Sequence, residues 1–337
     1  MNEITILATN RYVPETYSVT KEIYKSVGID EDRYKAINIQ KVHIADNENA
    51  YDMALKCAKK LLEKSNIDKN NIRYIVYASA VNEYIIADYS MKLCRELGLW
   101  NAQTVNINQF CNSAIVALEY LNYQLKLLPE KQYGLMITSE CFHDIGINRW
   151  TAANTLYYGD GASAALLGKS TDGLVIRDCN DFTVGKYNEM WKMPIGGLKS
   201  KFSTIEAIKK AFNYEFGKSE ENIVNPMVLF KLMGDSSKKV VLDMLNKNKL
   251  NIGDIDHLVM YNPGEFMQNF LLKTLKVGHN KVLTETAKEY GHMGSSDIIF
   301  NLDYLLEQNK VNVGDNIVLF SMESGLNFRC VLLKRCV

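Results

Sequence analysis

Residues 111–140, CNSAIVALEYLNYQLKLLPEKQYGLMITSE, decide the fold because their layout returns at residues 294–323, GSSDIIFNLDYLLEQNKVNVGDNIVLFSME. Each segment begins with an apolar helical pattern, continues through a polar connection and ends in a buried strand pattern. The units before them also correspond at the same offset: residues 66–79, NIDKNNIRYIVYAS, and residues 249–262, KLNIGDIDHLVMYN, each place a polar turn before a strand. A single look-alike pair is common in α/β chains, but two consecutive pairs in register favour an internal duplication.

The rest of the chain continues the alternation of helices and strands. Helical or strand periodicity marks five segments, residues 50–65, 72–80, 113–128, 133–140 and, after an Asp-Gly turn, 157–170. This order predicts an α/β layered fold. We expect two halves, residues 1–170 and 171–337, with an insertion at about 185–235 in the second half that caps the cleft and shapes a pocket.

Composition excludes several classes of protein. The 337 residues are 47% hydrophobic and 23% charged, so the chain can bury a large core. Lys plus Arg (39) equals Asp plus Glu (39), which disfavours binding to nucleic acid or to an anionic membrane. The N-terminus lacks a signal-peptide pattern, and no window approaches the ~20 apolar residues of a membrane span. We therefore expect a cytoplasmic protein.

Seven cysteines are scattered along the chain without a Cys-x-x-Cys pair. This pattern argues against both a disulfide framework and a metal site, and most of the thiols are expected to be buried. Cys111 differs because it lies between the strand-like TVNINQ (104–109) and the start of an apolar helix. Free N–H groups at a helix start stabilise a thiolate and the oxyanion formed when it attacks a thioester. On pattern alone, a nucleophile and a packed cysteine remain equally open.

The duplication gives Cys111 a partner. His292, in EYGHMGSSD (289–297), lies just before the helix that corresponds to the one beginning after Cys111. Two residues at equivalent places in two related halves are expected to face one central cleft. His292 is thus a candidate for the base that activates the cysteine.

Six stretches occur in the order found in 3-ketoacyl-ACP synthase III, which the chain resembles over nearly its whole length. They are NIQKVHIAD (38–46), the cysteine in NQFCNSAIVALEYL (108–121), YGDGASAALLG (158–168), IDHLVMYNPGEFMQNFL (255–271), EYGHMGSSD (289–297) and VLFSMESGLNF (318–328). The resemblance implies the thiolase fold, a duplicated five-layer α/β/α/β/α architecture. It also implies a homodimer, since the family is usually homodimeric.

The resemblance assigns roles to several residues. It makes Cys111 the nucleophile that takes an acyl group from a CoA or acyl-carrier-protein (ACP) thioester. The backbone N–H groups of Cys111 and of the run around Ser324 then form the oxyanion hole. Two positions depart from the family pattern, since Tyr261 stands where these enzymes have a histidine and His292 where they have an asparagine.

These departures bear on the reaction. In the family, the histidine and the asparagine together bind the malonyl carbonyl and stabilise the enolate left by decarboxylation, so decarboxylative condensation is in doubt. His292 is better suited to keep Cys111 as a thiolate and to deprotonate an acceptor. Asp297 either holds the imidazole tautomer or only stabilises a helix N-terminus. Tyr261 either donates a hydrogen bond to the acyl carbonyl or fills the space of the family's histidine.

The sequence therefore predicts an acyltransferase of specialised, polyketide- or fatty-acid-like metabolism that works through an acyl-Cys111 thioester. Acyl-ACP or acyl-CoA is its substrate, and no other cofactor and no metal are expected. One alternative is a decarboxylating 3-oxoacyl-ACP synthase, in which His292 and Tyr261 orient the malonyl unit. Another is a non-catalytic thiolase-fold subunit of a heterodimer, although a cysteine kept at a helix start argues against it.

Overall fold

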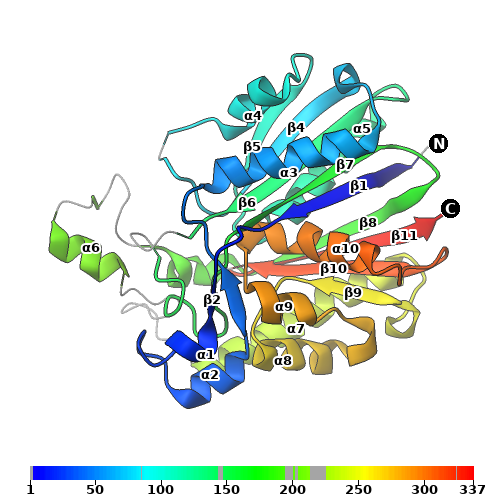
Figure 1. The fold of residues 1–337 in the computed structure, drawn as a ribbon. Helices are drawn as coiled ribbons and strands as arrows, with labels where there is room; N and C mark the ends of the chain where they lie inside the picture. The colour runs from blue at the N-terminus through cyan, green and yellow to red at the C-terminus, as the bar shows by residue number, and fades with distance from the viewer. Residues whose placement is uncertain are drawn as a thin grey trace.

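The computed structural model describes residues 3–84, 86–142, 147–193, 200–201, 204–212, 225–323 and 325–337, with only the backbone of residues 190, 191, 211 and 212. Within these ranges, nine strands form one mixed sheet in the order β5–β4–β6–β7–β1–β8–β11–β10–β9 (Figure 1). The strands are β1 Ile4–Tyr12, β4 Ile72–Ala78, β5 Gln103–Ile107, β6 Tyr133–Glu140, β7 Gly161–Lys169, β8 Gly173–Thr183, β9 His257–Met260, β10 Asn316–Glu323 and β11 Asn327–Cys336. A small separate sheet pairs β2 Tyr17–Val19 with β3 Lys41–His43.

The helices of the described residues alternate with these strands. The α-helices are α1 Thr20–Ile23, α2 Glu31–Ile37, α3 Ala50–Ser65, α4 Tyr89–Leu97, α5 Ser113–Lys126, α6 Ile205–Phe212, α7 Pro226–Lys247, α8 Glu265–Leu275, α9 Glu285–Tyr290 and α10 Asp297–Glu307. Short 3₁₀ turns are η1 Lys69–Asn71, η2 Gly185–Trp191, η3 Ile252–Asp254, η4 His279–Lys281 and η5 Gly294–Ser296. None of these helices is long and apolar enough to cross a membrane.

The strand order is the same when it is followed inward from either end of the sheet. In the first half, β4 is parallel to β5 and β6, and β7 is antiparallel to β6 and β1. In the second half, β9 is parallel to β10, and β11 is antiparallel to β10 and β8. In the second half, the place that corresponds to β5 is taken by an isolated parallel bridge between Leu258 and Val282. The two sequence pairs that predicted a duplication thus occupy equivalent places, β4 with β9 and α5–β6 with α10–β10.

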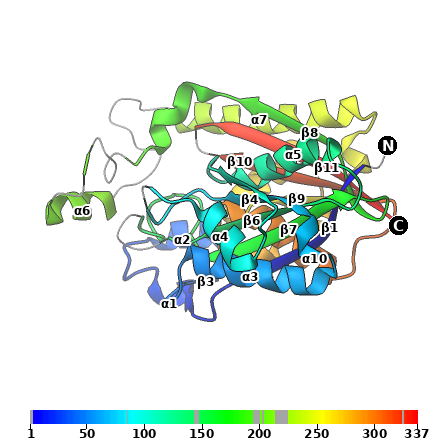
Figure 2. The same ribbon diagram turned by 90° about the horizontal axis from the view of Figure 1, so that it is seen from above.

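Helices form three layers around the two halves of the sheet. Helices α5 and α10 lie between the halves, where α10 contacts β1 and β7 of one half and β9 and β10 of the other (Figure 2). Helices α3 and α4 cover the outer face of the first half, and α7, with α8 packed against it, covers the outer face of the second. The α/β/α/β/α architecture expected from the resemblance is confirmed.

Local sequence signals explain where the helices begin and which face they bury. Helix α3 starts with a capping box. The side chain of Asn49 accepts a hydrogen bond from the N–H of Asp52, and the side chain of Asp52 accepts one from the N–H of Asn49. Helix α5 is apolar over most of its surface because it lies between the halves, with Ile115, Leu118 and Leu121 buried.

The predicted boundary after residue 170 falls in the short turn between β7 and β8. The predicted insertion, residues 185–235, contains η2, α6 and the start of α7, and its other residues lie largely outside those described. Helix α6 stands apart from the sheet (Figures 1 and 2). The division into halves at residue 170 and the role of the insertion stay predictions.

Candidate active site

Cys111 lies in a tight turn between β5 and α5. The turn is closed by hydrogen bonds from the N–H of Asn112 to the carbonyl of Gln109 (3.0 Å) and from the N–H of Ser113 to the carbonyl of Phe110 (3.1 Å). Phe110 has a φ of 43°, a region that residues with side chains seldom adopt. The chain thus turns sharply before α5 and leaves the partly exposed Cys111 directly before the helix, as its position in the sequence predicted.

The second half of the chain holds this turn. The side-chain amide of Asn112 donates to both the carbonyl (2.9 Å) and Oδ1 (2.8 Å) of Asn327 at the start of β11. The hydroxyl of Ser321 on β10 donates to the carbonyl of Cys111 at 3.4 Å. The Cys111 turn is therefore positioned by residues from both halves.

His292 lies in the connection between α9 and η5. Its N–H donates to the carbonyl of Tyr157 (2.9 Å), and its carbonyl accepts from the N–H of Gly159 (3.0 Å). This close approach requires glycine, since a Cβ on Gly159 would lie 2.2 Å from the carbonyl oxygen of Tyr290. The backbone of His292 is consequently fixed against the segment that leads into β7.

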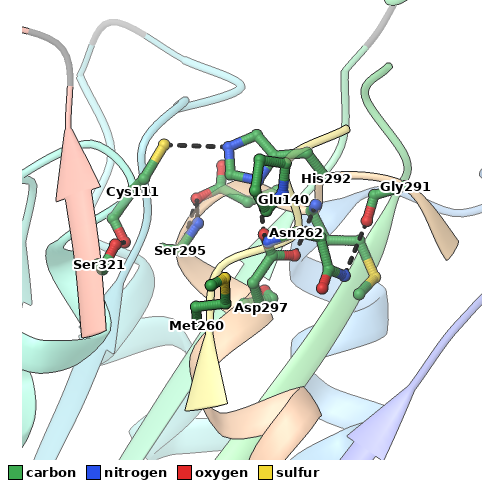
Figure 3. A network of polar contacts seen from close by, with 12 residues as sticks. Cys111, Glu140, Met260, Asn262, Gly291, His292, Ser295, Asp297 and Ser321 are labelled. Atoms are coloured by element: carbon green, nitrogen blue, oxygen red, sulfur yellow. Dashed lines mark hydrogen bonds and ion pairs between the residues drawn. The ribbon is translucent and has the colours of Figure 1, made fainter. Parts of the chain in front are cut away.

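The side chains of Cys111, His292 and Asp297 form one chain of contacts (Figure 3). The Sγ of Cys111 lies 3.1 Å from Nε2 of His292, and Nδ1 of His292 lies 2.5 Å from Oδ2 of Asp297. The imidazole and the carboxylate are almost fully buried, with exposed fractions of 2% and 0%. Asp297 also accepts hydrogen bonds from the N–H groups of Asn262 and Met293, both at 2.8 Å. Asp297 thus stands at the start of α10 and also contacts the imidazole of His292, and its role stays a prediction.

The electrostatics of His292 favour its protonated form. Burial lowers the pKa of the imidazole, but the carboxylate of Asp297 and the sulfur of Cys111 raise it, and the net result is a pKa well above the usual range. The hydrogen bond to Asp297 places a proton on Nδ1, so Nε2 is the nitrogen that faces the sulfur. An imidazolium beside a cysteine is the arrangement that supports a thiolate nucleophile.

Two tyrosines flank the imidazole. The ring of Tyr261, directly after β9, lies edge-on to the ring of His292 with centroids 5.8 Å apart. The centroid of the ring of Tyr158 lies 5.6 Å from that of the same imidazole. Burial raises the pKa of both phenols, and the sulfur of Cys111 adds to the increase. The structure thus brings Tyr261 to the site, while Tyr158 is a site residue that sequence reasoning missed.

Sequence reasoning also missed two buried residues that support the His292 loop. The amide of Asn262 donates to the carbonyl of Gly291 at 2.9 Å, and its Oδ1 accepts from the amide of Asn301 at 2.7 Å. Glu140, at the end of β6, accepts from the hydroxyl of Ser295 (2.6 Å), and burial raises its pKa to about 7. The signal that could have revealed Glu140 is a carboxylate at the end of the buried strand pattern YGLMITSE.

Of the two residues expected to form the oxyanion hole, only Cys111 belongs to the described part of the chain. Cys111 precedes α5 as predicted, but Ser324 lies outside the described residues. Next to it, Glu323 accepts a hydrogen bond from the side-chain amide of Gln109 at 2.6 Å, and burial raises the pKa of its carboxyl to about 7. The roles of the Cys111 and Ser324 N–H groups stay predictions.

The chain is similar to known proteins along almost its whole length. The family model for the C-terminal part of 3-oxoacyl-[acyl-carrier-protein] synthase III matches residues 245–335, which include Tyr261, His292 and Asp297. The chain is 27% identical to the beta-ketoacyl-[acyl-carrier-protein] synthase III of Clostridium novyi, with 99% of each chain covered. The corresponding enzyme of Campylobacter fetus is 24% identical, again over 99% of each chain. Over its whole length, the chain is thus similar to 3-ketoacyl-ACP synthase III (KAS III).

Solved structures show the same fold for this KAS III-like chain. ChlB3, described as an acyltransferase, superposes with a TM-score of 0.86 at 21% identity over 99% of this chain and 98% of that one. The 3-oxoacyl-[acyl-carrier-protein] synthase III of Aquifex aeolicus gives 0.81 at 20% identity over 98% and 99%. The priming beta-ketosynthase of the R1128 polyketide pathway gives 0.80 at 19% over 99% and 97%. At these identities the superpositions establish the thiolase fold.

Proposed function

We propose that this KAS III-like chain is an acyltransferase that carries the acyl group as a thioester on Cys111. The observation that supports it best is the chain of contacts from Sγ of Cys111 through the imidazole of His292 to the carboxylate of Asp297. The proposed nucleophile contacts the proposed base, and the base contacts the carboxylate that orients it. Enzymes with a catalytic triad use this arrangement for acyl transfer.

The transfer proceeds in two half-reactions. In the first, the thiolate of Cys111 attacks the carbonyl carbon of an acyl-ACP or acyl-CoA thioester. The bond from that carbon to the carrier sulfur breaks, and the departing thiol takes its proton from Nε2 of His292. In the second, an acceptor with a hydroxyl, amine or thiol group gives its proton to Nε2 and attacks the acyl carbon. The bond to Cys111 then breaks and the thiolate is restored.

Side chains at the site favour acyl transfer over condensation. Decarboxylation of a malonyl unit calls for two donors on its carbonyl, and here the imidazole of His292 is engaged by Cys111 and Asp297 on its two nitrogens. ChlB3, which superposes with a TM-score of 0.86, is described as an acyltransferase and supports the same reaction. We place the reaction in specialised, polyketide- or fatty-acid-like metabolism, in a homodimeric protein.

One observation favours a second function. The curated relatives that match over 99% of the chain are named beta-ketoacyl-[acyl-carrier-protein] synthase III. A condensing enzyme would form the same acyl-Cys111 thioester and then release carbon dioxide from malonyl-ACP, with Tyr261 and His292 orienting the malonyl carbonyl.

Two measurements separate these functions and test the proposal. Intact-mass spectrometry after exposure to an acyl-CoA or acyl-ACP is expected to show one acyl adduct on the wild type and none on Cys111→Ala. When an acyl donor and malonyl-ACP are added together, carbon dioxide is expected to be released no faster than from malonyl-ACP without the acyl donor. Carbon dioxide release stoichiometric with a 3-oxoacyl product would establish the condensing enzyme, and absence of the adduct would point to a non-catalytic subunit.

A further inference from the structure

Tyr158 is built into the same backbone contact that fixes His292. The residues on either side of it, Tyr157 and Gly159, hydrogen-bond to the N–H and the carbonyl of His292. The turn that follows is held by Asp160, whose carboxylate forms a buried ion pair with Arg149 at 3.1 Å. The main chain of Tyr158 is therefore fixed against the backbone of His292.

The ring of Tyr158 is also fixed. It packs against Phe142 with centroids 4.5 Å apart, and its centroid lies 5.6 Å from that of the ring of His292. Two aromatic contacts restrict both side-chain torsions of the tyrosine. The phenol consequently occupies one defined place beside the imidazole.

The hydroxyl of Tyr158 takes no part in the contacts that hold its ring. It makes no hydrogen bond to any other described residue, although the ring is held on two sides. Tyr158 is partly exposed, whereas Tyr261, the other tyrosine beside the imidazole, is 4% exposed. Because burial and the charge of Cys111 raise the pKa of Tyr158, the phenol stays protonated and is a hydrogen-bond donor at neutral pH.

Tyr158 and the sulfur of Cys111 both lie close to the imidazole of His292. In the second half-reaction, the acceptor oxygen must come within hydrogen-bond distance of Nε2 of His292 to lose its proton. A phenol fixed against the same ring is the neighbouring donor for that oxygen.

We propose that Tyr158 binds the acceptor hydroxyl and orients it toward His292 for transfer of the acyl group from Cys111. This inference rests on the acyltransferase function proposed above and concerns only its second half-reaction. The acceptor O–H bond breaks with its proton passing to Nε2, the C–O bond forms and the C–S bond to Cys111 breaks. The phenol proton of Tyr158 stays on its oxygen throughout and is shared with the acceptor oxygen.

The two half-reactions are measured separately on the full chain. Wild type, Tyr158→Phe and Tyr157→Phe are acylated with an acyl-CoA, and the rate of adduct formation is followed by intact mass. The excess donor is then removed, and loss of the adduct is followed in buffer alone and with added 1-propanol. Water is the smallest hydroxyl acceptor, so the deacylation rate is measurable whether or not the alcohol is used.

Tyr157→Phe is the matched control. Tyr157 is the adjacent tyrosine, but its buried hydroxyl has no hydrogen-bond partner among the described residues and its ring packs against Trp150. Removal of that hydroxyl is expected to leave both half-reactions unchanged. Tyr158→Phe is expected to acylate at the wild-type rate and to lose the adduct about tenfold more slowly, the effect of one lost hydrogen bond in the transition state.

Each outcome has one meaning. Equal deacylation rates for Tyr158→Phe and wild type, or an equal slowing of acylation and deacylation, would overturn the role of Tyr158. Absence of the adduct on the wild type would instead overturn the acyltransferase function itself. Slower deacylation only in Tyr158→Phe, with Tyr157→Phe like the wild type, supports the assignment.

Discussion

Cys111 and His292 are 181 residues apart in the chain, yet Sγ and Nε2 lie 3.1 Å apart. Each residue precedes the helix of its own half that lies between the two parts of the sheet, α5 for Cys111 and α10 for His292. Their contact therefore follows from the duplication. Asp297 extends the contact through Nδ1 of the imidazole.

Asp297→Asn is expected to lower the rate of Cys111 acylation on the order of 100-fold or more. The side-chain amide of the new asparagine can still accept a hydrogen bond from the N–H of Met293. It is a weaker acceptor than the carboxylate for the proton on Nδ1 of His292, and its NH₂ group can donate to the ring instead. Single-turnover acylation followed by intact mass measures the effect. Asp315→Asn is the control, because Asp315 forms a similar contact with His257 (3.1 Å) outside the site. Comparable losses in both variants would show that Asp297 acts only on stability.

The raised pKa of His292 predicts a pH dependence of stability. Since the folded pKa lies above the unfolded value of about 6.5, this histidine stabilises the fold fully below that value, and the contribution is lost as pH rises through the folded pKa. The difference in free energy of unfolding between wild type and His292→Gln should thus be larger at pH 6 than at pH 9. Denaturant unfolding at both pH values measures it.

The pKa of His43 is shifted in the opposite direction, so its effect on stability has the opposite pH dependence. Burial lowers the pKa of its imidazole despite a hydrogen bond with the carbonyl of Pro14, so its contribution is present above about pH 6.5 and is lost as pH falls. The wild type should lose stability relative to His43→Gln on acidification. If both histidine variants changed in the same direction with pH, the environment assigned to His292 would be wrong.

The sequence predicted the elements that depend on pattern and repetition. Helix α3 has the predicted bounds, β6 has the predicted bounds, and the meeting of Cys111 with His292 followed from equivalent positions in the halves. The place of Tyr158 depends instead on contacts between segments with no local signal, since its ring meets His292 only when the connection before β7 pairs with that before η5. Periodicity carries no information about such a contact.

A homodimer is expected to assemble through β5. This strand is paired with β4 on one side, and within the described residues its other edge has no partner strand. Free edges of this kind form sheets across subunits unless they are protected. Light scattering during size exclusion should give twice the chain mass of 38.3 kDa. A monomer at micromolar concentration would contradict the prediction.

Gly159→Ala is expected to destabilise the protein by several kcal/mol and to abolish acylation of Cys111. The new Cβ would lie 2.2 Å from the carbonyl oxygen of Tyr290, so the segment that holds His292 must move. Gly185→Ala is the matched control, because a Cβ at Gly185 would meet no atom within 4 Å. Thermal unfolding and single-turnover acylation of both variants test this close approach. A Gly159→Ala protein with wild-type stability and acylation would mean that the backbone of His292 is not held against this segment.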